Sequence, residues 1–117
     1  MIDSNVEVVI APSQVHLSSV RDSLRGDIQV SAQDVWKSGA GAYTGETNAG
    51  MLTDLGVKWS LIGHSERRQK GESDAECASK AKHALDNKVS YHVDYVKRIQ
   101  PIIVSFEWII SIVICVG

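Results

Sequence analysis

The 117-residue chain contains only two cysteines, two prolines and one phenylalanine. Two cysteines, Cys77 and Cys115, are too few for the disulfide scaffold of a small secreted domain. The short polar start, residues 1–5, shows no secretory signal. We therefore expect reduced thiols and a cytoplasmic location.

Strong charge of either sign is also missing. Twelve basic and fourteen acidic residues leave a net charge of −2, and no basic cluster is present, so we do not expect a nucleic-acid partner. The four histidines lack metal-ligand spacing: His16, His64, His83 and His92. His64 and Glu66 match half of the zinc deaminase signature, but no Pro-Cys-x-x-Cys motif follows. Gly39 and Gly41 do not complete a dinucleotide fingerprint, because the next glycine is one position late. We expect neither a metal nor a cofactor.

Strand and helix patterns alternate along the first three quarters of the chain. Apolar, β-branched runs predict strands at 6–10, 28–32 and 58–62. Helical spacing follows the first strand, in Val15, Leu17, Val20 and Leu24. The glycine-rich residues 39–45 predict a loop, and residues 48–55 a helix that Gly56 closes. Alternation of this kind favours a parallel sheet with helical crossovers.

A last helix is predicted after Ser73. The Ser73-x-x-Glu76 spacing is that of a capping box. A stripe of mostly small residues is expected to pack on the sheet: Ala75, Ala78, Ala81, Ala84 and Leu85. Three or four strand–helix units are too few to close a barrel. We therefore expect an open parallel sheet, marginal stability and a tendency to associate.

A candidate catalytic residue, His64, follows the third predicted strand directly, in Gly63-His64-Ser65-Glu66-Arg67-Arg68. An imidazole where a buried strand turns into a helix lies in an oriented electrostatic field suited to electrophilic catalysis. The alternative is a hydrogen-bonded structural histidine.

Several blocks together resemble triosephosphate isomerase in sequence, order and spacing, continuously from about residue 5 to 87. They are Val6-Glu7-Val8-Val9-Ile10-Ala11-Pro12, Ile28-Gln29-Val30-Ser31-Ala32-Gln33-Asp34, Gly41-Ala42-Tyr43-Thr44-Gly45-Glu46, Met51-Leu52-Thr53-Asp54-Leu55-Gly56 and the His64 block. The resemblance implies an α/β fold, namely the second to fourth units of a (β/α)8 barrel. It also implies a homodimer that interconverts glyceraldehyde 3-phosphate and dihydroxyacetone phosphate in glycolysis and gluconeogenesis, without a cofactor.

The resemblance implies site residues as well. His64 corresponds to the electrophile that polarises the substrate carbonyl, and Ser65 and Glu66 to supporting residues. Simple helix N-capping is the alternative for Ser65. Thr44, Gly45 and Glu46 correspond to a loop that inserts into the other subunit, and Arg67 and Arg68 to residues used in structural ion pairs and the interface. The alternatives are an ordinary flexible glycine loop and a solvated charge.

The chain departs from the family pattern at both ends. We expect that the Asn-x-Lys strand, the catalytic glutamate and the late phosphate-binding loops lie outside it. We therefore expect no turnover by this chain alone, since general-base catalysis contributes typically ~10²- to 10⁴-fold. The alternative function is a non-catalytic truncated product that associates with an intact isomerase subunit.

The C-terminal tail forms a second region. We divide the chain into a partial barrel domain, residues 1–87, and a divergent tail, residues 88–117. Residues 88–110 resemble nothing in the family, as a translated intron would, and residues 112–117 resemble its fifth strand. The apolar run 101–117 includes Glu107 and is rich in isoleucine and valine, which favours a strand over a membrane span.

Overall fold

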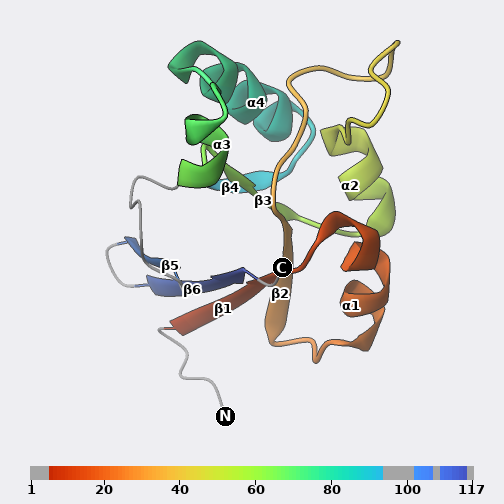
Figure 1. Ribbon diagram of the computed structural model, residues 1–117. Coiled ribbons are helices and arrows are strands. Elements are labelled where there is room, and N and C mark those ends of the chain that lie inside the picture. Colours follow the sequence, from red (N-terminus) through yellow and green to blue (C-terminus); the bar gives the residue numbers. More distant parts are fainter. Residues whose placement is uncertain (1–5, 94–101, 107–108, 116–117) are drawn as a thin grey trace.

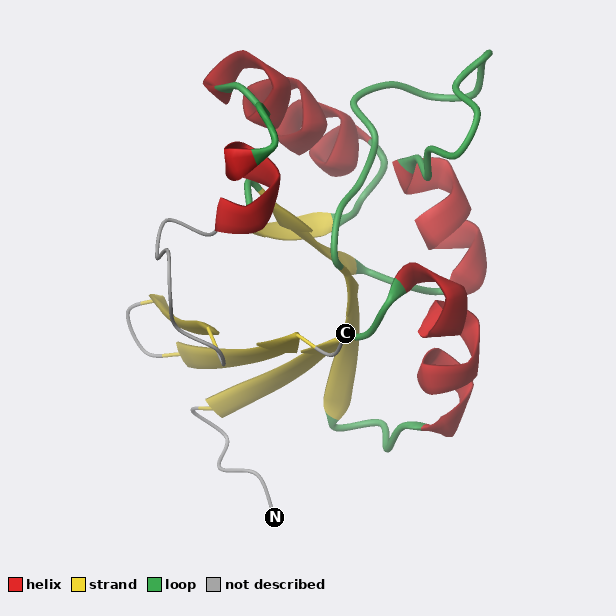
Figure 2. Ribbon diagram, viewed as in Figure 1, coloured by secondary structure: helices red, strands yellow, loops and turns green. Residues whose placement is uncertain are grey.

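The computed structural model describes residues 6–93, 102–106 and 109–115. A curved sheet with helices on one side forms the molecule (Figures 1 and 2). Its elements in chain order are β1 (Val6–Ala11), the 3-10 turn η1 (Gln14–His16), α1 (Leu17–Ser23), β2 (Ile28–Ala32), α2 (Ala49–Leu55), β3 (Trp59–Ile62), α3 (Ser65–Gln69), α4 (Asp74–Asp86), β4 (Ser90–Val93), β5 (Ile102–Phe106) and β6 (Ile109–Cys115).

The first four strands are parallel neighbours, joined by helices. The sheet order is β4-β3-β2-β1-β6-β5. Val9 aligns with Gln29, Ser31 with Trp59, and Trp59 with Ser90. Figure 2 shows the helices on the outer, convex side of this sheet. The predicted strands and their parallel order are therefore confirmed, and the fold is part of a (β/α)8 barrel.

The two C-terminal strands lie at the opposite edge of the sheet from β4. β6 pairs in parallel with β1, and β5 pairs antiparallel with β6. The resemblance of residues 112–117 to the family's fifth strand implied that the next barrel strand after β3 comes from these residues. In the structure β4 lies beside β3 instead, and β6 extends the sheet beyond β1. The preference for strand over helix in the tail is confirmed, and no helix within the described ranges has the length and apolarity needed to cross a membrane. The domain boundary at residue 87 stays a prediction.

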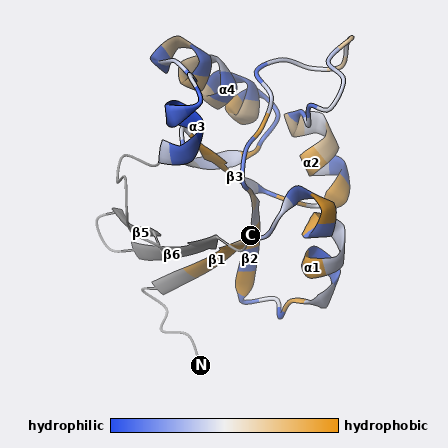
Figure 3. Cartoon of the chain, viewed as in Figure 1, coloured by the Kyte–Doolittle hydropathy of each residue, from blue (hydrophilic) through white to orange (hydrophobic). Residues whose placement is uncertain are grey.

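Apolar side chains fill both faces of the sheet. The larger core lies between sheet and helices and includes Leu17, Val30 and Leu52, all buried. A smaller cluster on the opposite face contains Val9, Ala11 and Leu61. Figure 3 shows the contrast between β3, which carries hydrophobic residues, and the mainly hydrophilic α3. Alternate residues of a strand thus serve two cores, as expected for a barrel segment.

Local signals define the ends of the helices. The Asn48 side chain accepts a hydrogen bond from Met51 N at the start of α2, and Gly56 ends that helix in the left-handed conformation, with φ of 78°. The Ser73 side chain accepts from Glu76 N at the start of α4, which confirms N-capping by Ser73, and the Glu76 carboxylate lies 3.4 Å from Ser73 Oγ. The first helix differs from prediction: it starts with a 3-10 turn, and Val15 is exposed.

The buried face of α4 differs from the predicted alanine stripe. Ala84 is buried and Ala81 packs against the core as predicted, but Ala75, Ala78 and Leu85 are exposed, and Cys77 and Lys80 are buried in their place. Alanine is small enough for either face of a helix, so it specifies the face weakly. Lys80 instead forms buried ion pairs that hold this helix in its rotational position, as described below.

Candidate functional site

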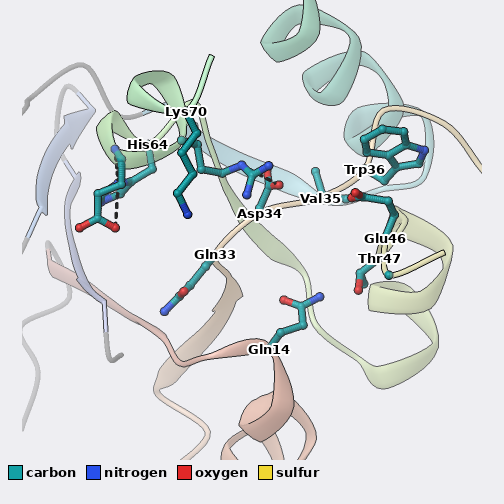
Figure 4. A pocket seen from close by; sticks show the side chains of 12 residues that line it. Gln14, Gln33, Asp34, Val35, Trp36, Glu46, Thr47, His64 and Lys70 are labelled. Carbon is teal, nitrogen blue, oxygen red and sulfur yellow. Dashed lines mark hydrogen bonds and ion pairs between the residues drawn. The ribbon is translucent and has the colours of Figure 1, made fainter. Parts of the chain in front are cut away.

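A pocket opens where the chain leaves the C-terminal ends of β1, β2 and β3, the edge at which barrel enzymes place their active sites. Its volume is about 500 Å³. Figure 4 shows His64 and Lys70 on one side and Trp36, Glu46 and Thr47 on the other. The lining residues are Gln14, Gln33, Asp34, Val35, Trp36, Gly45, Glu46, Thr47, His64, Glu66, Arg67 and Lys70.

His64 caps the N-terminus of α3 with its own imidazole. Its Nδ1 accepts a hydrogen bond from Glu66 N at 3.2 Å. An acceptor nitrogen cannot carry a proton, so the neutral ring carries its proton on Nε2. The side chain is 12 % exposed, and the Glu66 carboxylate lies 4.0 Å from Nδ1. The arrangement fixes which nitrogen of His64 can donate a hydrogen bond.

The predicted site residues divide into two groups. The pocket brings together His64, Glu66, Arg67, Gly45 and Glu46. Thr44 and Ser65 do not line it. The capping alternative for Ser65 is wrong, because His64 occupies the N-cap position and supplies the capping side chain.

The residues before α2 form a projecting loop, 37–46, that rises above the helix in Figure 1. Trp36 N donates to Thr47 O at 2.7 Å and closes its base, and Glu46 N donates to Tyr43 O at 3.0 Å. The Trp36 and Tyr43 rings pack at 5.5 Å between centroids. Thr44, between Tyr43 and Gly45 in this loop, is exposed. The loop is therefore closed at its base and open to solvent at its tip.

Arg67 belongs to an ion-pair network behind the pocket. Its Nε lies 3.0 Å from Asp34 and 3.1 Å from Glu72. Lys80, with a side chain only 1 % exposed, pairs with the same two carboxylates, at 2.9 Å from Asp34. The network joins the end of β2, α3 and α4 across a span of 46 residues between Asp34 and Lys80. Arg67 thus has a structural partnership within the chain, and Arg68 pairs with Asp74.

Burial and pairing shift the ionisation of this network. Burial raises the pKa of Asp34 despite hydrogen bonds and attraction from Lys80 and Arg67. Burial alone would also raise the pKa of Glu72, but hydrogen bonds from Lys80, Cys77 and Arg67 hold it below its usual value. Burial opposes the charge of Lys80, yet its bonds to Glu72 and Asp34 raise its pKa. Glu72 is therefore the carboxylate whose charge the fold stabilises.

Cys77 is part of the same cluster but is not a nucleophile. Its thiol donates a hydrogen bond to Glu72 Oε1 at 3.1 Å. Burial, together with this carboxylate, raises the pKa of the thiol to about 11. Since the thiolate is the reactive form, Cys77 is unreactive at neutral pH.

The sequence of the chain matches one protein family over the strands and helices that form this pocket. A family model described as triosephosphate isomerase matches residues 1–93. The chain is 52 % identical over 91 residues to "Triosephosphate isomerase" of Neurospora crassa, covering 76 % of the chain and 37 % of the relative. The chain belongs to the triosephosphate isomerase family.

Other relatives lie in different compartments. The chain is 48 % identical over 87 residues to "Triosephosphate isomerase, cytosolic" of Gracilaria gracilis, covering 72 % of the chain and 35 % of the relative. It is 43 % identical over 89 residues to "Triosephosphate isomerase, chloroplastic" of Secale cereale, covering 75 % of the chain and 30 % of the relative. The chain spans about a third of the length of these isomerases.

Sequence reasoning missed the network that supports this part of the isomerase fold. No motif or spacing in the sequence assigns a role to Asp34, Glu72 or Lys80. A weak signal existed: Lys80 lies three residues after Cys77 and four before Ala84, on the same face of α4 as these two residues. A lysine at such a position needs buried carboxylates, but their identity cannot be deduced from spacing.

Proposed function

We propose that this chain carries the carbonyl-polarising part of a triosephosphate isomerase site. The substrates are glyceraldehyde 3-phosphate and dihydroxyacetone phosphate, the triose phosphates of glycolysis and gluconeogenesis. His64 is the electrophile, and Ser65 and Glu66 support it. The observation that carries the proposal is the bond from Glu66 N to His64 Nδ1, which assigns the ring proton to Nε2 in a residue that lines the pocket.

We further propose that the chain alone does not turn over triose phosphates. Three carboxylates and two cations line the pocket, and Arg67 and Asp34 are paired with each other. The other charged lining residues are one cation, Lys70, and two carboxylates, Glu46 and Glu66. Their net negative charge disfavours binding of a phosphate dianion. A single well-placed donor contributes typically ~10²- to 10³-fold, which does not replace a base and a phosphate site.

A coupled assay of the purified chain, with and without His64→Gln, tests this proposal. We expect no turnover above background from either protein. His16→Gln is the matched control, because His16 is an exposed histidine of η1 outside the pocket. Turnover that disappears in His64→Gln but persists in His16→Gln would show that these 117 residues supply the missing groups.

A second candidate function is association with an intact isomerase subunit in the cytoplasm. The projecting loop supports it, because Thr44 is exposed in a loop whose base is closed by the bond from Trp36 to Thr47. Gly45, with φ of 88°, allows the sharp turn there. In this proposal Thr44, Gly45, Glu46 and Arg67 form the contact, as in a homodimer.

Capture of the Neurospora crassa isomerase by the immobilised chain tests the second candidate. We expect Thr44→Arg to reduce capture at least tenfold, because the longer charged side chain blocks close approach of the loop. Ser18→Arg on exposed α1 is the control and should leave capture unchanged. Equal capture by both variants would exclude the loop as the contact.

A further inference from the structure

His83, in the last turns of α4, forms a polar link to α2 that no role assigned so far explains. Its Nε2 accepts a hydrogen bond from Ala49 N, the first residue of α2, at 3.2 Å. The first N–H groups of a helix have no partner within the helix, so this contact satisfies one of them from a different element.

Further contacts align the two helices at the same place. Thr53 Oγ1 donates to Ala49 O at 3.0 Å and lies 3.1 Å from Asn87 O, in the residue that ends α4. Asn87 Nδ2 donates to His83 O at 2.9 Å and lies 3.3 Å from His83 Nδ1. The His83 link therefore belongs to a defined seam between α2 and the C-terminus of α4.

The protonation state of His83 decides whether the link to Ala49 exists. A neutral imidazole has one acceptor nitrogen, and a protonated imidazole has none. Asn87 Nδ2 donates to His83 O, which is nearer to it than His83 Nδ1 is. The lone pair of the neutral imidazole is therefore on Nε2, where it accepts the hydrogen bond from Ala49 N. Protonation replaces this bond by two opposed N–H groups, and the positive end of the α2 dipole adds to the repulsion.

The ionisable groups on the surrounding elements do not offset that repulsion. On α4, one turn from His83, Lys80 pairs with Asp34 and Glu72, and Asp86 pairs with Lys82. On α2 the ionisable side chain is Asp54, which is exposed.

Ala49 also connects the seam to the projecting loop. It follows Asn48, which caps α2, and Thr47, whose carbonyl closes the base of the loop. We propose that His83 is a proton-dependent latch: while neutral it holds the first residue of α2, and through it the base of the 37–46 loop. The latch makes His83 a positioning residue for the loop, and its link to subunit association rests on the proposed function.

Amide hydrogen exchange of the full chain at pH 7.5 and pH 5 tests the latch. We expect the protection factor of Ala49 N–H to fall roughly five- to tenfold at pH 5, the loss of one hydrogen bond. The Leu61 amide of β3 should keep its protection. Unchanged protection at Ala49, or an equal loss at Leu61, would overturn the proposal.

Two variants separate the latch from general acid effects. His83→Gln keeps an acceptor oxygen but does not titrate, so Ala49 should stay protected at both pH values. His16→Gln should keep the pH dependence of the original chain. Persistence of the pH dependence in His83→Gln would refute the latch.

Capture of the Neurospora crassa isomerase then tests the consequence for the loop. At pH 5 the His83→Gln chain should be captured better than the original chain, and at pH 7.5 equally well. Equal capture of both chains at pH 5 would overturn the link between latch and loop. Absence of capture in all samples would overturn the proposed association, whereas the exchange data decide on the latch independently.

Discussion

Lys80 is the residue whose replacement should most clearly reveal how α4 is held. Its side chain is 1 % exposed, and its Nζ lies 2.9 and 3.0 Å from the two Asp34 oxygens while also donating to Glu72. Lys80→Met keeps the length and apolar stem but removes the charge. The variant leaves Glu72, only 4 % exposed, with Arg67 as its remaining cation.

The expected cost follows from these contacts. Removing one partner of a buried ion pair costs about 3–5 kcal/mol. Arg67 still contacts both carboxylates, and the Asp34 side chain is 20 % exposed. We therefore expect about 3 kcal/mol, the lower end of the range. With a urea dependence of roughly 1.5 kcal/mol/M, the unfolding midpoint should fall by about 2 M.

Urea unfolding followed by circular dichroism measures this shift. Lys82→Met is the matched control, because Lys82 lies on the same helix in an exposed pair with Asp86. It should leave the midpoint nearly unchanged. Adding Asp34→Asn to Lys80→Met should recover at least half of the loss, since Arg67 and Glu72 then remain as a balanced ion pair. A Lys80→Met midpoint as close to the original as that of Lys82→Met would refute the reasoning.

Two further predictions concern pH and backbone conformation. The pKa of Glu72 is lower in the folded chain than its usual 4.5, so its charge stabilises the fold above that pH, and this contribution is lost as the pH falls through the folded value. The difference in urea midpoint between the original chain and Glu72→Gln should therefore shrink between pH 7 and pH 3, and a constant difference would contradict the assignment. Gly56→Ala should lower stability by roughly 1–2 kcal/mol, because φ is positive and a Cβ would lie 2.8 Å from the Arg21 guanidinium. Gly26→Ala, where no atom lies within 4 Å, is the control, and equal midpoints for the two variants would exclude this strain.

The sequence by itself determined the features that depend on neighbouring residues. The strands 6–10, 28–32 and 58–62 follow from short β-branched runs, and the observed strands match them within a residue or two. Capping by Ser73 and helix termination by Gly56 are likewise local, because each depends on one side chain or one backbone conformation. The position of His64 after β3 follows from the same local pattern, and the family follows from blocks of consecutive residues.

Only the tertiary structure decided which distant groups meet. The alanines of α4 could not specify its buried face; the pairing of Lys80 with Asp34, 46 residues away, did. Pairing also placed β4 beside β3 and the more apolar β6 beside β1, an arrangement between segments far apart in the sequence. Glu46 and His64 share a pocket because the loop before α2 and the turn after β3 leave the same end of the sheet. Such contacts depend on packing and charge between residues far apart in the sequence. A spacing of three or four residues carries no information about them.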